Sequence, residues 1–213
     1  MLPPYLDQLG FERQEVFKKL KRFSKNFTLA GGTAIMLQIG HRMSFDFDCF
    51  GRQKLSETLP RKVRDVFGKF IYLKLRTSEQ ITFHTEKGVE ITFVYHPYKP
   101  LREPIETDSI TLFHLDDLAA NKAYTIGRRG VWRDYVDLFF LLKWKLYDLQ
   151  AIIALAEKKF TVEFSEKLFL AQLTYFDDIV VMDTDFLKES YTPSEIQRFL
   201  EKEVRDYLAR ILP

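Results

Sequence analysis

The sequence of 213 residues has one cysteine and no apolar run close to the roughly 20 residues of a membrane helix. The single Cys49 excludes an internal disulfide framework and a zinc site built from cysteines. The first residues lack the basic segment followed by an apolar segment that marks a secretory signal peptide. We therefore expect a cytoplasmic protein with no membrane partner.

The sequence also lacks a large excess of charge of one sign, because 32 basic and 30 acidic residues give a net charge of only +2. This value argues against a protein that binds nucleic acid over its whole surface. The charges are uneven, however: residues 51–76 hold eight basic and two acidic residues, and residues 177–213 hold nine acidic and five basic residues. The basic segment is either an RNA-binding face or a set of solvated side chains, and both interpretations stay open.

Residues 27–50, FTLAGGTAIMLQIGHRMSFDFDCF, are the most informative stretch of the chain. Their pattern predicts a short strand over 27–30, a glycine turn, and a helix over 34–39 that Gly40 ends. A second strand is predicted over 44–50. The chain should therefore fold locally as strand, turn, helix and strand.

The second strand alternates, so that Ser44, Asp46 and Asp48 should share one face and large apolar side chains the other. Two carboxylates two positions apart on a strand have Cα atoms about 7 Å apart and repel each other unless a cation or water screens them. Mg²⁺ is commonly bound by one or two carboxylates together with substrate phosphates. Asp46 and Asp48 are therefore predicted to hold Mg²⁺, or Mn²⁺ in its place.

The turn before the helix reads Gly31-Gly32-Thr33. The free N–H groups of a helix start can receive a phosphate, and glycine lets that phosphate approach the backbone closely. Arg42 precedes the aspartate strand and could reach a triphosphate. A phosphate site beside a metal site suits phosphoryl transfer from a nucleotide.

These motifs resemble a known superfamily. A Gly-Gly-Thr followed by Asp-x-Asp thirteen positions after its threonine is similar to the signature of the nucleotidyltransferases with the DNA polymerase β-like fold. The longer string LAGGTA…HRMSFDFDCF resembles the AbiEii/AbiGii toxin family, with Cys49 as a minor departure after Asp48. The resemblance also implies an active-site role for Ser44.

The segment DLAANKAYTIGRRGVWRDYVDLFFLL resembles later motifs of the same family, a helix with an active-site lysine and a helix with an active-site aspartate. Lys122 matches the lysine, and Asp134 and Asp137 both match the aspartate, with Asp137 preferred. From the residues alone, the two acids share one face of a nearly apolar helix and need partners such as Lys122 or Arg133. A structural salt bridge and a nucleotide-binding role for Lys122 and Asp134 both stay open.

Further strands are predicted over 71–76, 80–85 and 89–95, with a helix over 56–70 between the aspartate strand and the first of them. Glu90 is the only acid in the last strand. Because the superfamily often takes a third carboxylate from a neighbouring strand, Glu90 is a candidate metal ligand; the alternative is a solvent-facing side chain. Later in the chain, Asp116 or Asp117 is expected to cap a helix that ends at Gly127.

The resemblance implies an α+β fold. A small N-terminal mixed β-sheet nucleotidyltransferase core with flanking helices, residues 1–100, would precede a mostly helical C-terminal domain, residues 101–213, that contributes Lys122 and Asp137 to the active site. The boundary is placed in the segment 95–110, which contains Pro97, Pro100 and Pro104.

The resemblance also implies the function: metal-dependent transfer of NMP from an NTP to an RNA 3′ end, with tRNA preferred. The protein would then be the toxin of a toxin–antitoxin pair in phage abortive infection, with a cognate antitoxin as partner. Two alternatives differ in class. One is a non-catalytic RNA-binding protein with the same fold, and the other is an enzyme that modifies a protein or a small molecule.

Overall fold

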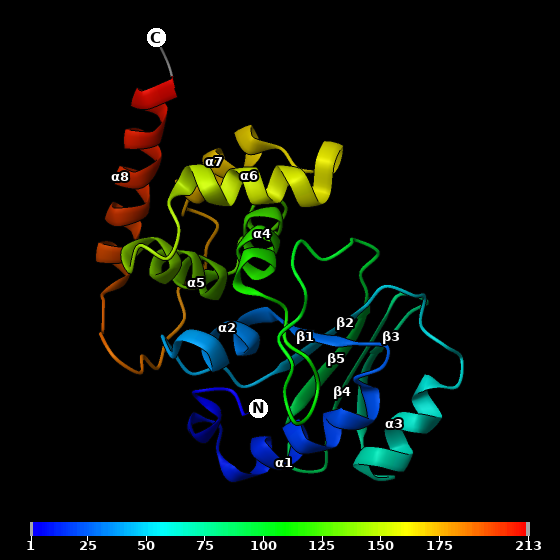
Figure 1. Cartoon of the computed structure of the whole chain (residues 1–213). Coiled ribbons are helices and arrows are strands. Elements are labelled where there is room, and N and C mark those ends of the chain that lie inside the picture. The colour runs from blue at the N-terminus through cyan, green and yellow to red at the C-terminus, as the bar shows by residue number, and fades with distance from the viewer. Residues whose placement is uncertain (1, 212–213) are drawn as a thin grey trace. The chain divides into compact units, whose positions relative to one another are not determined.

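The computed structural model describes residues 2–211 and divides the chain into two compact units (Figure 1). One unit ends at His114 and the other begins at Leu115, whereas the sequence suggested a boundary after Pro100. No helix within residues 2–211 combines the length and the apolar character that a membrane crossing requires.

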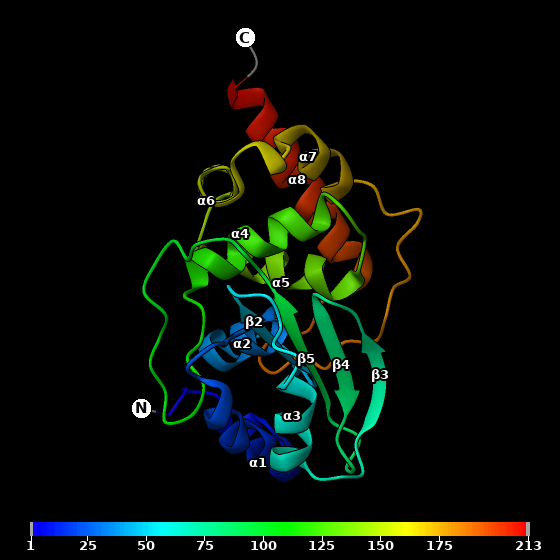
Figure 2. The same ribbon diagram turned by 90° about the vertical axis from the view of Figure 1, so that its right-hand side faces the viewer.

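The first unit is built on a five-stranded mixed sheet with the order β1-β2-β5-β4-β3. The pair β2–β5 is parallel and the other three pairs are antiparallel. Figure 2 shows β2, β5, β4 and β3 side by side. The strands are β1 (Thr28–Ala30), β2 (Phe47–Gly51), β3 (Tyr72–Arg76), β4 (Gln80–His84) and β5 (Glu90–Tyr95).

The segment after residue 100 belongs to this unit because it is bonded to strand β1. The Leu29 N–H donates to the Thr111 carbonyl at 2.8 Å, and the Phe113 N–H donates to the Leu29 carbonyl at 3.0 Å. These bonds satisfy the backbone of β1 on the side away from β2. Prolines in 95–110 therefore mark a long connection inside the unit, and the division comes after it.

Helical segments of the first unit pack against the sheet through an aromatic core. The Phe23 ring lies 5.9 Å from the Phe67 ring and 4.7 Å from the Phe93 ring, between ring centroids. Phe83 and Phe93 extend this cluster across β4 and β5. The helical elements are η1 (Leu6–Gln8), α1 (Phe11–Leu20), η2 (Lys21–Phe23), α2 (Gly31–Ile39) and α3 (Leu59–Phe67).

Helix α2 confirms the predicted strand–turn–helix unit and begins three residues earlier than the sequence suggested, at Gly31 rather than Ala34. It ends at Gly40, whose φ of 63° is left-handed and whose N–H donates to the Met36 carbonyl at 2.8 Å. A glycine is favoured there because other residues rarely adopt this conformation.

The aspartate strand is shorter than predicted, since β2 begins at Phe47 and not at Ser44. Side chains bind the backbone of the preceding residues: Arg13 Nε donates to the Phe45 carbonyl at 3.2 Å, and the Thr33 hydroxyl donates to the Asp46 carbonyl. Asp46 is therefore the last residue of a side-chain-bonded loop, and Asp48 is a strand residue.

The second unit is helical, as predicted, and its last helix begins with a capping box. The Thr192 N–H donates to Glu195 Oε2 at 2.7 Å, and the Glu195 N–H donates to Thr192 Oγ1 at 3.3 Å. The elements are α4 (Leu115–Ile126), α5 (Trp132–Lys143), α6 (Leu149–Phe160), η3 (Thr161–Glu163), α7 (Glu166–Leu173) and α8 (Pro193–Ile211).

The expected N-cap of α4 is wrong, because Asp116 and Asp117 lie inside the first turn of the helix. Their carboxylates have side-chain partners instead: Tyr147 donates to Asp116 at 2.6 Å and Lys159 donates to Asp117 at 2.7 Å. The Lys159–Asp117 pair is fully buried, and burial lowers the pKa of the Lys159 amine below its usual range. This pair joins α4 to α6.

Candidate active site

The start of α2 requires glycine at Gly31 for two reasons. Its φ of +68° is in the left-handed region, and a Cβ at this position would collide with Asp48 Oδ2. A side chain would therefore strain the backbone and displace the carboxylate. Glycine lets the Asp48 carboxylate lie directly against the helix start.

Gly32 makes room for the guanidinium group of Arg42 in the same way. A Cβ there would collide with Arg42 Nη2 and would lie 3.2 Å from Ser44 Oγ. Arg42 is 3% exposed, and its Nη1 donates to the Met43 carbonyl at 2.9 Å. The guanidinium thus lies beside the positive end of the α2 dipole, where an anion would be stabilised by both.

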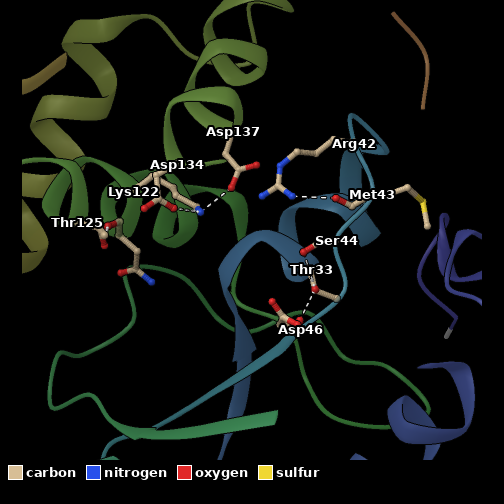
Figure 3. A network of polar contacts seen from close by, with 10 residues as sticks. Thr33, Arg42, Met43, Ser44, Asp46, Lys122, Thr125, Asp134 and Asp137 are labelled. Carbon is tan, nitrogen blue, oxygen red and sulfur yellow. Dashed lines mark hydrogen bonds and ion pairs between the residues drawn. The ribbon is translucent and has the colours of Figure 1, made fainter. Parts of the chain in front are cut away.

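A hydroxyl pair holds the loop that presents Asp46 (Figure 3). Thr33 Oγ1 lies 2.9 Å from Ser44 Oγ, and the Thr33 hydroxyl also donates to the Asp46 carbonyl. Thr33 and Ser44 are buried, at 1% and 9% exposure. Both side chains therefore position the Asp46 backbone, while the Thr33 N–H belongs to the first turn of α2.

The carboxylates face away from the aromatic core. Phe47 and Cys49 are fully buried, whereas Asp46 and Asp48 are partly exposed, which confirms the alternation predicted for this part of the strand. Burial raises the pKa of the Cys49 thiol well above its ordinary value, with a smaller contribution from the charge of Asp48. Cys49 is therefore a core residue, and the two aspartates are the partly exposed acids beside it.

Glu90 lies on β5, the strand next to β2, but its carboxylate is bound to other side chains. Lys74 Nζ lies 2.6 Å and His84 Nε2 3.2 Å from Glu90 Oε2. The bond to Glu90 raises the pKa of Lys74, and the charge of Asp46 adds to this effect. Within residues 2–211, no three or more His, Cys, Asp or Glu side chains form a metal-binding group, so a third-ligand role for Glu90 stays a prediction.

In the second unit, one buried lysine binds both candidate acids (Figure 3). Lys122 Nζ lies 2.5 Å from Asp134 Oδ1 and 2.5 Å from Asp137 Oδ2. Side-chain exposure is 9% for Lys122 and Asp134 and zero for Asp137. The spacing of three residues on α5 therefore places both acids at the same amine of α4, as the helical pattern predicted.

A model of the family described as nucleotidyl transferase AbiEii toxin, Type IV TA system, matches residues 18–210. The chain belongs to this family. It is thus a member of a family of nucleotidyltransferase toxins, and the resemblance seen in the motifs of both units is confirmed.

Relatives of this AbiEii-family chain span nearly its whole length. A protein of Aquifex aeolicus (strain VF5), aq_aa25, described as uncharacterized, is 29% identical over 94% of this chain and 98% of its own length. JHP933 from Helicobacter pylori has a similar structure, with a TM-score of 0.58 at 17% identity over 99% of this chain and 95% of that one.

MenT4, the nucleotidyltransferase toxin Rv2826c from Mycobacterium tuberculosis H37Rv, is similar with a TM-score of 0.57 at 12% identity. The match covers 92% of this chain and 82% of that one. At these identities the solved structures show a common fold, the nucleotidyltransferase-like α+β fold.

The AbiEii-family structure adds one residue that sequence reasoning missed, Asn121. Both polar atoms of its side chain are buried, and neither has a hydrogen-bond partner among residues 2–211; the same is true of Asp134 Oδ2. A buried amide without partners is rare in native proteins. The only sequence signal was its place directly before Lys122 in the motif.

Proposed function

We propose that this AbiEii-family protein transfers NMP from an NTP to the 3′ hydroxyl of an RNA, with Mg²⁺ or Mn²⁺ as cofactor. The observation that supports it most is the contact between the Asp48 carboxylate and the glycine start of α2. It supports the proposal because carboxylates suited to a metal ion and a helix start suited to a phosphate lie close together, which is the combination that phosphoryl transfer requires.

Asp46 and Asp48 suit a divalent cation because they offer hard oxygen ligands and are partly exposed. Such a cation would neutralise negative charge on the triphosphate. The Thr33–Ser44 pair keeps the Asp46 backbone in place, so that the two carboxylates do not need to reorganise when the nucleotide binds.

The triphosphate is received by the backbone N–H groups at the start of α2 and by Arg42. Ala30, the N-cap residue, has no side-chain acceptor, so the first N–H groups of α2 are not capped by it. The buried guanidinium beside Gly32 adds a fixed positive charge. Binding energy at this position holds the α-phosphorus in line with the acceptor oxygen.

In the reaction, the acceptor oxygen forms a bond to the α-phosphorus, the bond from that phosphorus to the pyrophosphate oxygen breaks, and pyrophosphate leaves. The acceptor loses its proton to a carboxylate or to solvent. Lys122 stabilises the charge that develops on pyrophosphate, and Asp134 and Asp137 orient its amine. Asp134, whose Oδ2 has no hydrogen-bond partner among residues 2–211, is a further candidate for nucleotide binding.

RNA is proposed as the acceptor, and tRNA as the preferred RNA, from the family and from the basic segment 51–76. In the cell the protein acts as the toxin of a type IV toxin–antitoxin pair in phage abortive infection, and a cognate antitoxin opposes its activity.

The test is an incubation of the purified protein with Mg²⁺, each labelled NTP in turn, and total tRNA. We expect one NTP to label tRNA in the wild-type reaction and no labelling by Asp46→Asn. Asp65→Asn is the matched control, because it neutralises an exposed carboxylate on α3 that has no proposed role in the site.

Equal labelling by wild type and Asp46→Asn would overturn the assignment of Asp46 as a metal ligand. Labelling of protein or of small molecules in a lysate, with none on RNA, would overturn the acceptor. RNA binding without turnover in the presence of every NTP would favour the non-catalytic binding protein.

A further inference from the structure

Strand β3 forms one edge of the sheet in the first unit (Figure 2). All five of its residues are exposed. An edge strand of a soluble protein is usually short, charged or covered, because exposed apolar edges pair with other chains. The side chains on β3 and in the turn before it are therefore unusual enough to need an explanation.

Large apolar side chains gather on this edge. Phe70 is 79% exposed and Tyr72 70%, and Leu73 and Leu75 are 44% and 42% exposed. The register with β4 places Tyr72 and Leu75 on the face of the sheet that carries His84, and Leu73 on the opposite face. Single exposed apolar residues are common on protein surfaces, but several large ones along one edge strand favour an interaction site.

Basic side chains flank the aromatic rings. Lys69 and Arg76 are exposed on either side of Tyr72, and no acidic residue occurs between them in the chain. We call the residues Lys69, Phe70, Tyr72, Leu73, Leu75 and Arg76 the edge surface. Its composition suits a negatively charged partner that has flat apolar groups.

The edge surface is poorly suited to pairing with another β-strand. The register between β3 and β4 shifts between Leu73 and Leu75, which makes Lys74 the extra residue of a β-bulge. Bulges and edge lysines are devices that prevent strand addition. In a pairing of two copies, basic residues of one β3 would also oppose those of the other, which is unfavourable.

We infer that the edge surface binds the single-stranded 3′ segment of the acceptor RNA, with Phe70 and Tyr72 stacking on bases and Lys69 and Arg76 contacting phosphates. This inference rests on the proposed function and adds the surface that holds the acceptor. Stacking on exposed aromatic rings together with basic contacts to the backbone is the common mode of binding for single strands.

The sheet register places this surface in line with the catalytic carboxylates. Tyr72 is paired with His84, and His84 with Glu90, across β3, β4 and β5. Because Phe47 is paired with Ile91, Asp46 lies at the level of Glu90 on the next strand. Three strand spacings of about 4.8 Å separate the edge from Asp46, roughly 14 Å, which a few extended nucleotides can span.

The test measures RNA binding separately from turnover. Fluorescence anisotropy of a labelled single-stranded RNA is recorded with Asp46→Asn as the parent, which keeps the surface but not the chemistry. We expect the added pair Phe70→Ala and Tyr72→Ala to weaken binding by about tenfold or more. We expect the pair Lys69→Ala and Arg76→Ala to reduce the slope of log affinity against log salt by about 1.4, since each contact to a single strand contributes about 0.7.

Two matched controls separate the edge surface from general exposure and charge. Phe11→Ala removes a ring that is 71% exposed on α1, and Lys167→Ala removes an exposed charge from α7. Neither should change the affinity for RNA. Equal losses in controls and edge variants, or no loss in either edge pair, would overturn the inference.

Light scattering decides whether the edge surface is instead a contact between copies. A wild-type dimer that Phe70→Ala and Tyr72→Ala convert to monomers would overturn the inference, whereas a monomer in every variant supports it. The edge residues are exposed, so all variants should unfold at the wild-type temperature.

Failure of this inference is distinguishable from failure of the proposed function. If the otherwise wild-type protein labels RNA with the same KM for RNA after the edge substitutions, the edge surface does not bind the acceptor RNA. The proposed transfer of NMP to RNA is then retained. If the edge substitutions abolish RNA binding but no NTP labels RNA, the edge surface does bind RNA and the proposed reaction is wrong.

Discussion

The two units of this chain both contain a pair of aspartates, and they treat the pair in opposite ways. In the first unit, Asp46 and Asp48 are partly exposed and lie against a glycine turn. In the second unit, Asp134 and Asp137 are buried and share the amine of Lys122. The number of acids is the same, and the environment of each pair differs.

The comparison indicates a division of tasks. Partly exposed carboxylates keep oxygen ligands accessible to a cation and a nucleotide. Buried carboxylates must be neutralised by a permanent partner, because an unpaired charge in the interior is costly. The first pair is therefore suited to bind what enters the site, and the second pair to hold a cation that belongs to the protein.

The largest expected effect is a loss of activity after substitution in the first pair of aspartates, Asp46 and Asp48. Asp46→Asn should lower NMP transfer by about a thousandfold or more, because the cation would lose one of its two charged ligands. The unfolding temperature should stay at the wild-type value, since Asp46 is partly exposed. Initial rates with saturating NTP and RNA, together with thermal unfolding, check both statements, and a rate within tenfold of wild type would contradict the first.

The next effect tests whether the second pair needs its lysine for folding. Lys122→Met should reduce the free energy of unfolding by about 3 kcal/mol or more, because Asp134 and Asp137 would lose their counter-charge. Denaturant titration measures this loss.

Lys159→Met is the matched control for Lys122, because it removes a lysine from the other buried pair of the same unit. Both variants should be destabilised to a similar degree, but only Lys122→Met should lose activity per folded molecule. Full activity in Lys122→Met would show that Lys122 has only a structural role, and would contradict the proposed role of its amine in the reaction.

A smaller effect is expected for Gly31 at the start of α2, where a substitution would both strain the backbone and displace the Asp48 carboxylate. Gly31→Ala should destabilise the first unit by about 1–3 kcal/mol through its positive φ and should also lower activity by moving Asp48. Gly88→Ala is the control, because Gly88 has a φ of +76° and no atom within 4 Å of the position that a Cβ would take. Denaturant titration should show strain in both variants, and rate measurements a loss only in Gly31→Ala; equal rates would contradict the contact with Asp48.

The smallest expected effect concerns Glu90. Its bonds to Lys74 and His84 predict that Glu90→Gln lowers activity by about tenfold or less. A loss as large as that of Asp46→Asn would instead make Glu90 the third metal ligand, and the dependence of the rate on Mg²⁺ concentration would then shift in the same variant.

Sequence patterns predicted most elements of the fold, because local rules decide them. The glycine end of α2 and the three strands predicted over 71–76, 80–85 and 89–95 all occur where the sequence indicated. Predictions were less accurate where distant residues compete for the backbone. The start of β2 and the division of the chain after His114 depend on bonds from Arg13, Thr33 and residues 111–113 that no local pattern contains.

The candidate site followed the same rule. Gly31, Gly32, Asp46, Asp48 and Lys122 could be selected from the sequence because their residue types and spacing are those that metal, phosphate and charge require. Their partners could not: the sequence did not predict that Asp117 pairs with Lys159, that Glu90 binds Lys74, or that the Asn121 amide is buried without a partner.

The sequence by itself determined the family, the order of the helices and strands, and the residue types of the site, because short-range periodicity and motif spacing encode them. Only the tertiary structure decided which of these side chains are exposed and which are neutralised. It placed Asp46 and Asp48 within reach of solvent, and it buried Asp137 against Lys122. Burial and ion pairing depend on contacts between segments far apart in the chain, and those contacts exist only after the segments have packed together.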